Sequence, residues 1–210
     1  MMIRLSLRRK LLWGGMFALA MGYFEAALVQ YLRELYYPDG FVFPLVRPPE
    51  RMMLIELGRE AASILMLASV GVLLGSGFID RFAGFAFCFG VWDIGYYLFL
   101  ELFEGWPSSP GTMDVLFLIP LVWVGPVWAP VAVSAALIWG AVTVWRRLDR
   151  GRVLRPTALE WVLEVCAALV IVGSFLAGGP GAAGRSNPSF PWWLWAAGVS
   201  LGVGIFIRIL

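Results

Sequence analysis

Acidic side chains inside long apolar stretches are the residues of this chain best placed for chemistry. Glu25, Glu60 and Asp93 each lie within a different stretch. A charged side chain is costly inside a bilayer, and it usually faces the interior of a helix bundle or a water-filled cavity. Counted inward from the predicted outer ends of their helices at about 1.5 Å per residue, the three carboxylates lie roughly 10–15 Å deep. The sequence therefore predicts that they meet at one level in the outer half of the membrane.

Helical spacing adds charged neighbours to Glu60. Glu56 lies four residues before Glu60 and shares its face, and Arg59 lies three residues after Glu56. Two carboxylates on one face repel each other unless a cation, a proton or a ligand separates them. Arg59 is the basic residue predicted at this depth, whereas Arg33 is expected near the rim. We therefore expect at least one carboxylate to be protonated at neutral pH or to bind a cation.

Tyrosines accompany the third carboxylate. Asp93, Tyr97 and Glu101 follow one helical stripe at four-residue spacing, and Tyr96 flanks that stripe. Phenol hydroxyl groups could donate hydrogen bonds to a neighbouring acid. The predicted ligand- or proton-binding set is Glu25, Glu56, Arg59, Glu60, Asp93, Tyr96, Tyr97 and Glu101.

Three functions are compatible with this set. The leading hypothesis is a membrane protein with an acidic and aromatic pocket open to the outside, which transports with a proton or cation, or binds a small cationic ligand. The alternative is a non-catalytic subunit, whose buried polar network and aromatic outer loops hold a larger membrane complex together. An enzyme using carboxylates as general acid and base is a third. Asp93 and Asp114 lie on neighbouring segments, as the catalytic pair of an intramembrane aspartyl enzyme would require. Neither is part of a Gly-x-Gly-Asp motif, however, and Asp114 is expected too near the membrane surface.

Missing residue types exclude several chemistries. The chain has no histidine, which excludes Ser-His and Cys-His nucleophile pairs and histidine-ligated zinc, copper or haem. The one lysine, Lys10, is expected beside the N-terminal arginines, so no buried lysine is expected to form a Schiff base. Cys88 and Cys166 are too few for a thiolate metal site. No metal site or cofactor is predicted, and 16 basic against 14 acidic residues give no support for nucleic-acid binding.

The composition is that of a membrane protein. Hydrophobic residues make up 60% of the 210 residues and charged residues 14%, with a mean hydropathy of +0.81. Soluble domains have about 45–50% hydrophobic residues and about 25% charged residues. About twenty apolar residues cross a hydrocarbon core. The sequence predicts an all-α six-span bundle forming one transmembrane domain, 1–210, with spans at about 11–32, 52–78, 82–103, 115–145, 157–178 and 191–210.

The fourth stretch, 115–145, is too long for one upright helix and contains Pro120, Pro126 and Pro130. Proline removes a helical hydrogen bond and bends or breaks a helix. We predict a short helix over 115–123 at the outer interface, a break at Gly125-Pro126, and a membrane crossing from about 130 to 145. A single long kinked helix is the alternative, because membrane helices tolerate proline.

Basic residues set the predicted orientation, because loops rich in lysine and arginine stay in the cytoplasm. An even number of spans places on one side Arg4, Arg8, Arg9, Lys10, Arg81, Arg146, Arg147, Arg150, Arg152, Arg155 and Arg208. Both termini are thus predicted in the cytoplasm, in a bacterial or archaeal cytoplasmic membrane. The expected partner is the lipid bilayer. Small residues four apart, such as Gly71/Gly75 and Gly198/Gly202, would also permit a homo-oligomer or assembly with other membrane proteins.

Overall fold

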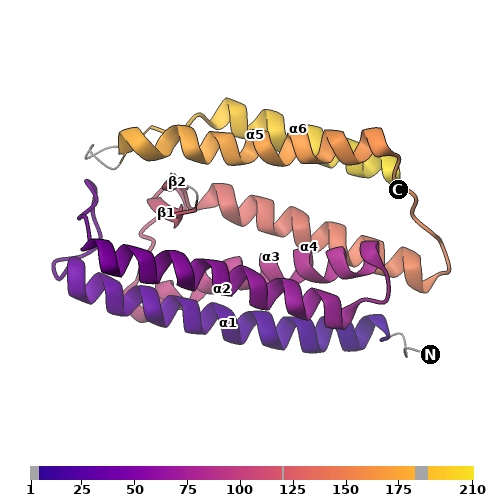
Figure 1. Cartoon of the computed structure of the whole chain (residues 1–210), viewed down its shortest axis with the longest axis horizontal. Coiled ribbons are helices and arrows are strands. Elements are labelled where there is room, and N and C mark those ends of the chain that lie inside the picture. The colour runs from indigo at the N-terminus through magenta and orange to yellow at the C-terminus, as the bar shows by residue number, and fades with distance from the viewer. Residues whose placement is uncertain (1–4, 120, 183–188) are drawn as a thin grey trace. The chain divides into compact units, whose positions relative to one another are not determined.

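The computed structural model describes residues 5–119, 121–182 and 189–210. Within these ranges the chain forms six helices, which Figure 1 labels. All six are long and apolar enough to cross a membrane. The predicted all-α six-span architecture is confirmed, and the chain is a polytopic integral membrane protein. The helices are α1 (Leu7–Tyr36), α2 (Glu50–Leu74), α3 (Phe78–Glu104), α4 (Trp128–Asp149), α5 (Ala158–Ala182) and α6 (Trp192–Ile209).

Glycines set the boundaries of α3 at both ends. Gly77 precedes its first turn, and Gly105 ends it in a left-handed conformation with φ of 65°. The Gly105 N–H donates to the Glu101 carbonyl oxygen at 3.0 Å, which satisfies one of the last carbonyl groups of the helix. α3 begins four residues before the predicted span, because Asp80 and Arg81, which are charged, continue the helix from Phe78.

The fourth apolar stretch differs from the prediction in its first part. The prediction of a short helix over 115–123 is wrong. Strands β1 (Met113–Phe117) and β2 (Trp123–Pro126) form an antiparallel hairpin there. Val115 pairs with Val124, and Phe117 with Trp123. β-Branched and aromatic residues favour a pleated surface over a helix, which explains the difference. The predicted break at Gly125-Pro126 is confirmed, and α4 follows it; Pro120 lies outside the described residues.

The chain divides into two compact units, which we describe separately. The first comprises Met1–Ala27, Ser63–Trp106 and Val131–Arg155. Close backbone approach at glycines holds its helices together. A Cβ atom added at Gly22 of α1 would lie 2.9 Å from the Trp92 carbonyl oxygen of α3, and one added at Gly71 of α2 would lie 2.6 Å from the Phe85 nitrogen.

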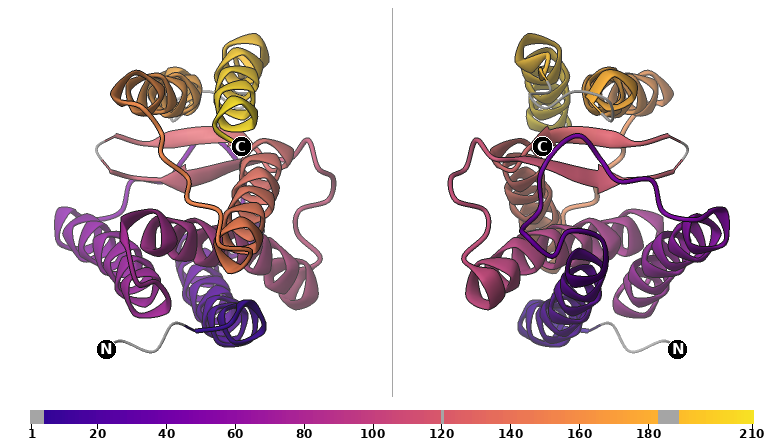
Figure 2. Two further views of the ribbon diagram at one scale, coloured as in Figure 1. Left: turned by 90° about the vertical axis from the view of Figure 1, so that its right-hand side faces the viewer. Right: turned by 90° about the vertical axis from the view of Figure 1, so that its left-hand side faces the viewer.

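The second unit comprises Leu28–Ala62, Pro107–Pro130 and Pro156–Leu210. In it α5 packs against α6 and against β2, and Figure 2 shows both helices on one face of the hairpin. A Cβ atom at Gly179 of α5 would lie 1.8 Å from the Val122 carbonyl oxygen, so this contact requires glycine. The Trp123 ring stacks on the Phe175 ring of α5, with centroids 6.2 Å apart.

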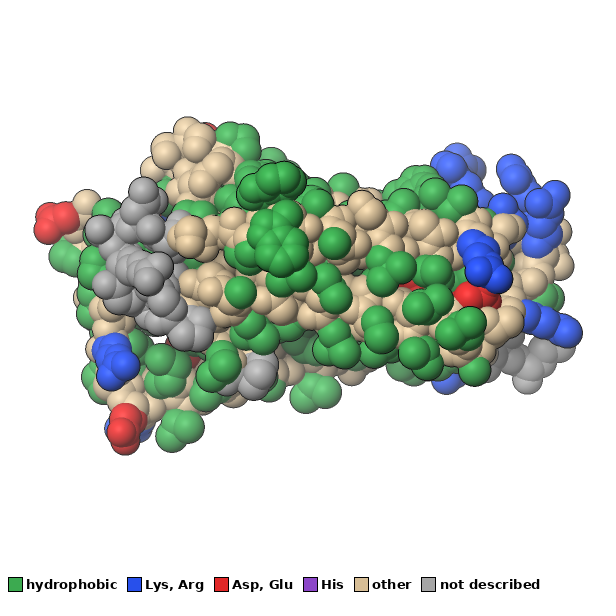
Figure 3. Space-filling view, turned by 90° about the horizontal axis from the view of Figure 1, so that it is seen from above, with side chains coloured by type: hydrophobic (Ala, Val, Ile, Leu, Met, Phe, Trp, Pro, Cys, Tyr) green, Lys and Arg blue, Asp and Glu red, His purple; other side chains and the backbone are tan. Residues whose placement is uncertain are grey.

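Apolar side chains are widely exposed along the helices. Leu54, Leu73 and Leu102 are among the exposed large hydrophobic residues. The face in Figure 3 carries hydrophobic side chains along the length of the helices, while basic side chains gather at one end. This distribution is expected for helices surrounded by lipid.

Candidate functional site

Glu25 of α1 lies in the first unit and is buried. The hydroxyl group of Ser63 of α2, itself buried, donates a hydrogen bond to Glu25 Oε2 at 3.3 Å. The contact joins side chains on two different spans.

Asp93 of α3 has an equivalent partner on α4. The Ser134 hydroxyl group donates to Asp93 Oδ2 at 2.8 Å, and Ser134 is buried. The two helices approach closely here, because a Cβ atom added at Gly90 would lie 2.6 Å from the Ser134 carbonyl oxygen. Asp93 and Ser134 are thus fixed relative to each other by backbone packing.

Packing between α1 and α3 sets the relative heights of Glu25 and Asp93. Gly14 faces Cys88, and Gly22 faces Gly95, so the two helices run in parallel with a constant offset. By this offset Glu25 is level with a position about one and a half turns beyond Asp93, or roughly 7–8 Å along the helix axes. The two carboxylates therefore lie at neighbouring levels of one unit. Their predicted meeting with Glu60 stays a prediction.

The aromatic and acidic residues that follow Asp93 lie along the same helix. The rings of Tyr96 and Tyr97 contact each other at 4.9 Å, and the Tyr97 ring lies 6.3 Å from the Trp106 ring. Tyr97 is buried, whereas Glu101 is exposed in the last turn of α3. The orienting role of the tyrosines stays a prediction.

Arg59 and Glu56 of α2 form an ion pair in the second unit. Arg59 Nε lies 2.7 Å from Glu56 Oε2, three residues away along the helix. The side chains are 19% and 14% exposed. This is the geometry that their spacing in the sequence predicts.

Glu60 binds the hairpin. Both of its carboxylate oxygens accept from the Leu118 backbone N–H, at 3.1 and 3.0 Å. Leu118 follows β1 directly, so this contact satisfies a backbone donor at the turn of the hairpin.

A second charged contact also holds the hairpin. Asp114 of β1 lies 3.5 Å from Arg33 of α1, and the Arg33 guanidinium lies 4.6 Å from the centre of the Phe41 ring. Both residues are buried within the protein. Their expected level near the membrane surface stays a prediction.

These contacts bring two kinds of hydrogen-bond partner to the carboxylates. A backbone N–H, as at Glu60, or a guanidinium, as at Asp114, only donates a hydrogen bond. A serine hydroxyl group both donates and accepts, so it can bind a carboxylate or a carboxylic acid. Glu25 and Asp93 have such a hydroxyl partner.

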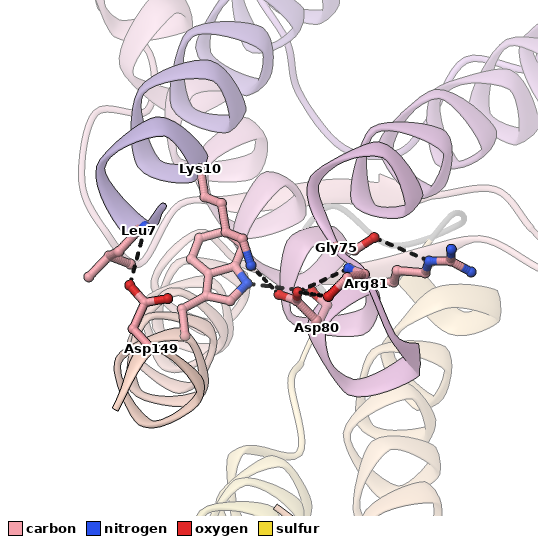
Figure 4. A network of polar contacts seen from close by, with 8 residues as sticks. Leu7, Lys10, Gly75, Asp80, Arg81 and Asp149 are labelled. Atoms are coloured by element: carbon pink, nitrogen blue, oxygen red, sulfur yellow. Dashed lines mark hydrogen bonds and ion pairs between the residues drawn. The ribbon is translucent and has the colours of Figure 1, made fainter. Parts of the chain in front are cut away.

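The sequence interpretation missed a charged network in the first unit. The Lys10 ammonium group donates to Asp80 Oδ1, and the Ser76 N–H and hydroxyl group donate to Asp80 Oδ2 at 3.0 and 3.2 Å (Figure 4). Lys10 also lies 5.3 Å from the centre of the Trp145 ring. The expectation that Lys10 is not buried is wrong, since only 1% of it is exposed.

Helical periodicity could have located Lys10. It precedes Gly14 and Ala18 at four-residue spacing, and these small residues mark the buried face of α1. A basic residue in phase with such a face points into the protein. Its place beside Arg8 and Arg9 in the sequence concealed this.

The start of α5 carries a local cap. The Thr157 hydroxyl group accepts from the Glu160 N–H at 3.2 Å, and Glu160 Oε2 accepts from the Thr157 N–H at 2.7 Å. This reciprocal pair is a capping box. Arg208 of α6 lies 3.7 Å from Glu160. The cap and this ion pair explain the presence of Glu160 without a functional role.

Among residues 5–119, 121–182 and 189–210, no three histidine, cysteine or acidic side chains form a group that could hold a metal ion. Cys88 and Cys166 are free thiols. No protein-family model, curated protein or solved structure matches this chain.

Proposed function

We propose that this protein binds protons or a small cation at Glu25 and Asp93 and couples that binding to transport, or to binding of a small cationic ligand. The observation that carries the proposal is that each of these carboxylates shares a hydrogen bond with a serine hydroxyl group of another span. Ionisable residues within membrane spans commonly serve in proton and ion pathways.

The hydroxyl partners support a change of protonation state. When a carboxylate is ionised, the hydroxyl group donates to it; when the acid is protonated, the same group can accept. Neither state then leaves the serine oxygen unsatisfied, so a proton or cation can be exchanged without separating the helices. Glu25 and Asp93 thereby form the centre of the proposed site.

The other predicted residues have supporting roles in this proposal. Arg59 neutralises Glu56, and Glu60 accepts from the Leu118 N–H of the hairpin. Tyr96 and Tyr97 lie beyond Asp93 on α3, where they would orient it, and Glu101 would attract cations near the end of the helix.

The arrangement of basic residues supports an orientation with both termini in the cytoplasm, in a cytoplasmic membrane. Assembly into a homo-oligomer is part of the proposal, because small residues four apart in the sequence permit close helix contacts.

Cation-dependent stability and proton uptake test this function. Purified protein in detergent is titrated with Na⁺, K⁺ and an organic ammonium ion while its melting temperature is recorded, and proton uptake is measured as the pH is lowered. We expect Glu25→Gln and Asp93→Asn each to remove stabilisation by the active cation and to reduce proton uptake.

Glu50→Gln and Asp39→Asn are the matched controls, because Glu50 and Asp39 are exposed. Both control variants should behave as the unmodified protein. Unchanged cation stabilisation and proton uptake in both Glu25→Gln and Asp93→Asn would refute the proposal.

A non-catalytic subunit of a membrane complex is the second candidate. It is favoured by the hairpin, which Glu60 and the Arg33–Asp114 pair hold against helices of the second unit. If Asp114→Asn abolishes co-purification of another membrane protein, while Asp93→Asn leaves cation stabilisation and proton uptake unchanged, the chain is a subunit.

A further inference from the structure

The first turn of α1 and the last turns of α4 contact each other, although their residues lie 142 positions apart in the sequence. The Leu7 N–H donates to Asp149 Oδ2 at 3.3 Å, which caps the beginning of α1 (Figure 4). The ammonium group of Lys10 lies over the Trp145 ring one turn further in. Two distant segments of the chain therefore share one end of the first unit.

Exposed arginines gather at this end. Arg8 and Arg9 lie on α1 beside Leu7, and Arg146 lies on the last turn of α4. Arg150 and Arg152 follow α4 directly, and all five are exposed. We call Arg8, Arg9, Arg146, Arg150 and Arg152 the basic cluster.

The backbone after α4 fixes the last two arginines of the cluster. Gly151 has φ of 74°, its N–H donates to the Leu148 carbonyl oxygen at 3.1 Å, and the Arg152 N–H donates to the Arg147 carbonyl oxygen at 3.0 Å. This pattern is a Schellman motif, which satisfies the terminal carbonyl groups with backbone donors. The arginine side chains are not needed to cap the helix, so their guanidinium groups can bind other acceptors.

Nearby acidic groups leave the cluster strongly positive. Asp80 is paired with Lys10, and Asp149, which accepts from the neutral Leu7 N–H, is one acidic group beside five arginines. Both α1 and α4 are long and apolar enough to cross a membrane, so their contacting ends reach the level of the lipid headgroups.

We propose that the basic cluster binds the phosphate groups of anionic phospholipid headgroups. Guanidinium groups match phosphate oxygens with paired hydrogen bonds, and basic residues close to a membrane end attract anionic lipids. Because the arginines come from two helices that contact each other, the site is a composite one, and both sets of arginines contribute to each bound lipid.

Lipid retention tests this proposal independently of ion binding. The protein is placed in nanodiscs of phosphatidylcholine and phosphatidylglycerol, extracted into mild detergent, and its retained lipids are counted by native mass spectrometry. Three double variants are compared: Arg8→Gln with Arg9→Gln, Arg146→Gln with Arg150→Gln, and, as control, Arg47→Gln with Arg51→Gln. Arg47 and Arg51 are also exposed but lie in the second unit.

We expect each of the first two variants to reduce retained phosphatidylglycerol about tenfold or more, and the control to retain it fully. Retained phosphatidylcholine should not change, and added inorganic phosphate should not displace the lipid. The proposal is overturned if the control loses as much lipid, if only one of the two cluster variants does, or if free phosphate displaces the lipid.

Discussion

Lys10 and Asp80 form a buried ion pair across 70 residues of sequence, with 1% and 4% of their side chains exposed. The pair joins the first turns of α1 and α3, and Trp145 of α4 contributes a ring beside Lys10 and an N–H 3.5 Å from the Asp80 carbonyl oxygen. Three spans thus meet around one charge pair.

Removing one partner of this pair should strongly destabilise the protein. Lys10→Met leaves Asp80 buried without its cation, and breaking a buried pair in this way costs about 3–5 kcal/mol. The free energy of unfolding, measured by denaturant titration in mixed micelles, should fall by this amount. Arg9→Met, at the neighbouring exposed position, should change it by less than about 0.5 kcal/mol.

A double replacement separates charge burial from packing. Lys10→Met combined with Asp80→Leu removes both charges and fills similar volume, and such exchanges are often neutral or stabilising. We expect the double variant to recover most of the stability that Lys10→Met loses. A double variant no more stable than Lys10→Met would indicate that the Ser76 and Trp145 contacts, rather than the ion pair, hold the three helices.

Apolar length predicted the spans, because about twenty apolar residues are needed to cross a bilayer whatever they contact. The same signal failed over 115–123, where Val115 and Trp123 belong to a hairpin rather than to a helix. Hydropathy does not distinguish these two uses; the β-branched and aromatic composition does, though only weakly.

Predicting the site depended on how far apart the partners lie in the sequence. The Glu56–Arg59 pair lies within one helix turn, so spacing alone identifies it. Ser63 and Ser134 bind Glu25 and Asp93 from other helices. The periodicity within one helix does not indicate which helices are neighbours, so these partners could not be predicted. Lys10 is the intermediate case: its phase on α1 predicts burial, while only the fold identifies Asp80 as its partner.

The hairpin should separate from α5 when Gly179 gains a side chain. A Cβ atom there would lie 1.8 Å from the Val122 carbonyl oxygen, a backbone atom that cannot rotate away. Gly179→Ala should therefore destabilise the protein by about 1–3 kcal/mol, measured as the free energy of unfolding in micelles. Gly173→Ala is the control on the same helix, because nothing lies within 4 Å of its added Cβ atom. It should be neutral or slightly stabilising, since alanine favours helix.

Glu60 should stabilise the hairpin both as a hydrogen-bond acceptor and through its charge. Glu60→Gln keeps an acceptor for the Leu118 N–H but loses the charge-assisted bond, so the free energy of unfolding should fall by about 1 kcal/mol. Glu60→Leu removes the acceptor altogether, and the free energy of unfolding should fall by about 1.5–3 kcal/mol. Hydrogen exchange of the β1 and β2 amides measures this locally, with exchange in Glu60→Leu faster than in Glu60→Gln. Glu50→Leu, at an exposed position of the same helix, should leave these amides protected; equal exchange in all three variants would exclude a role of Glu60 in holding the hairpin.

The Asp93–Ser134 hydrogen bond can report whether Asp93 changes its protonation state. A hydrogen bond to a charged group contributes about 1.5–3 kcal/mol, and one between neutral groups about 0.5–1.5 kcal/mol. A double-mutant cycle of Asp93→Leu and Ser134→Ala, measured as unfolding free energies at several pH values, isolates this interaction. If Asp93 exchanges a proton as proposed, the coupling energy should fall from the higher range to the lower one as the pH decreases.

The control cycle of Asp93→Leu with Ser174→Ala should be additive at every pH, because the Ser174 hydroxyl group donates to the Ile171 carbonyl oxygen of its own helix. A coupling energy that stays constant across the pH range would show that Asp93 keeps one protonation state, and the proposed proton site would then have to be Glu25 alone.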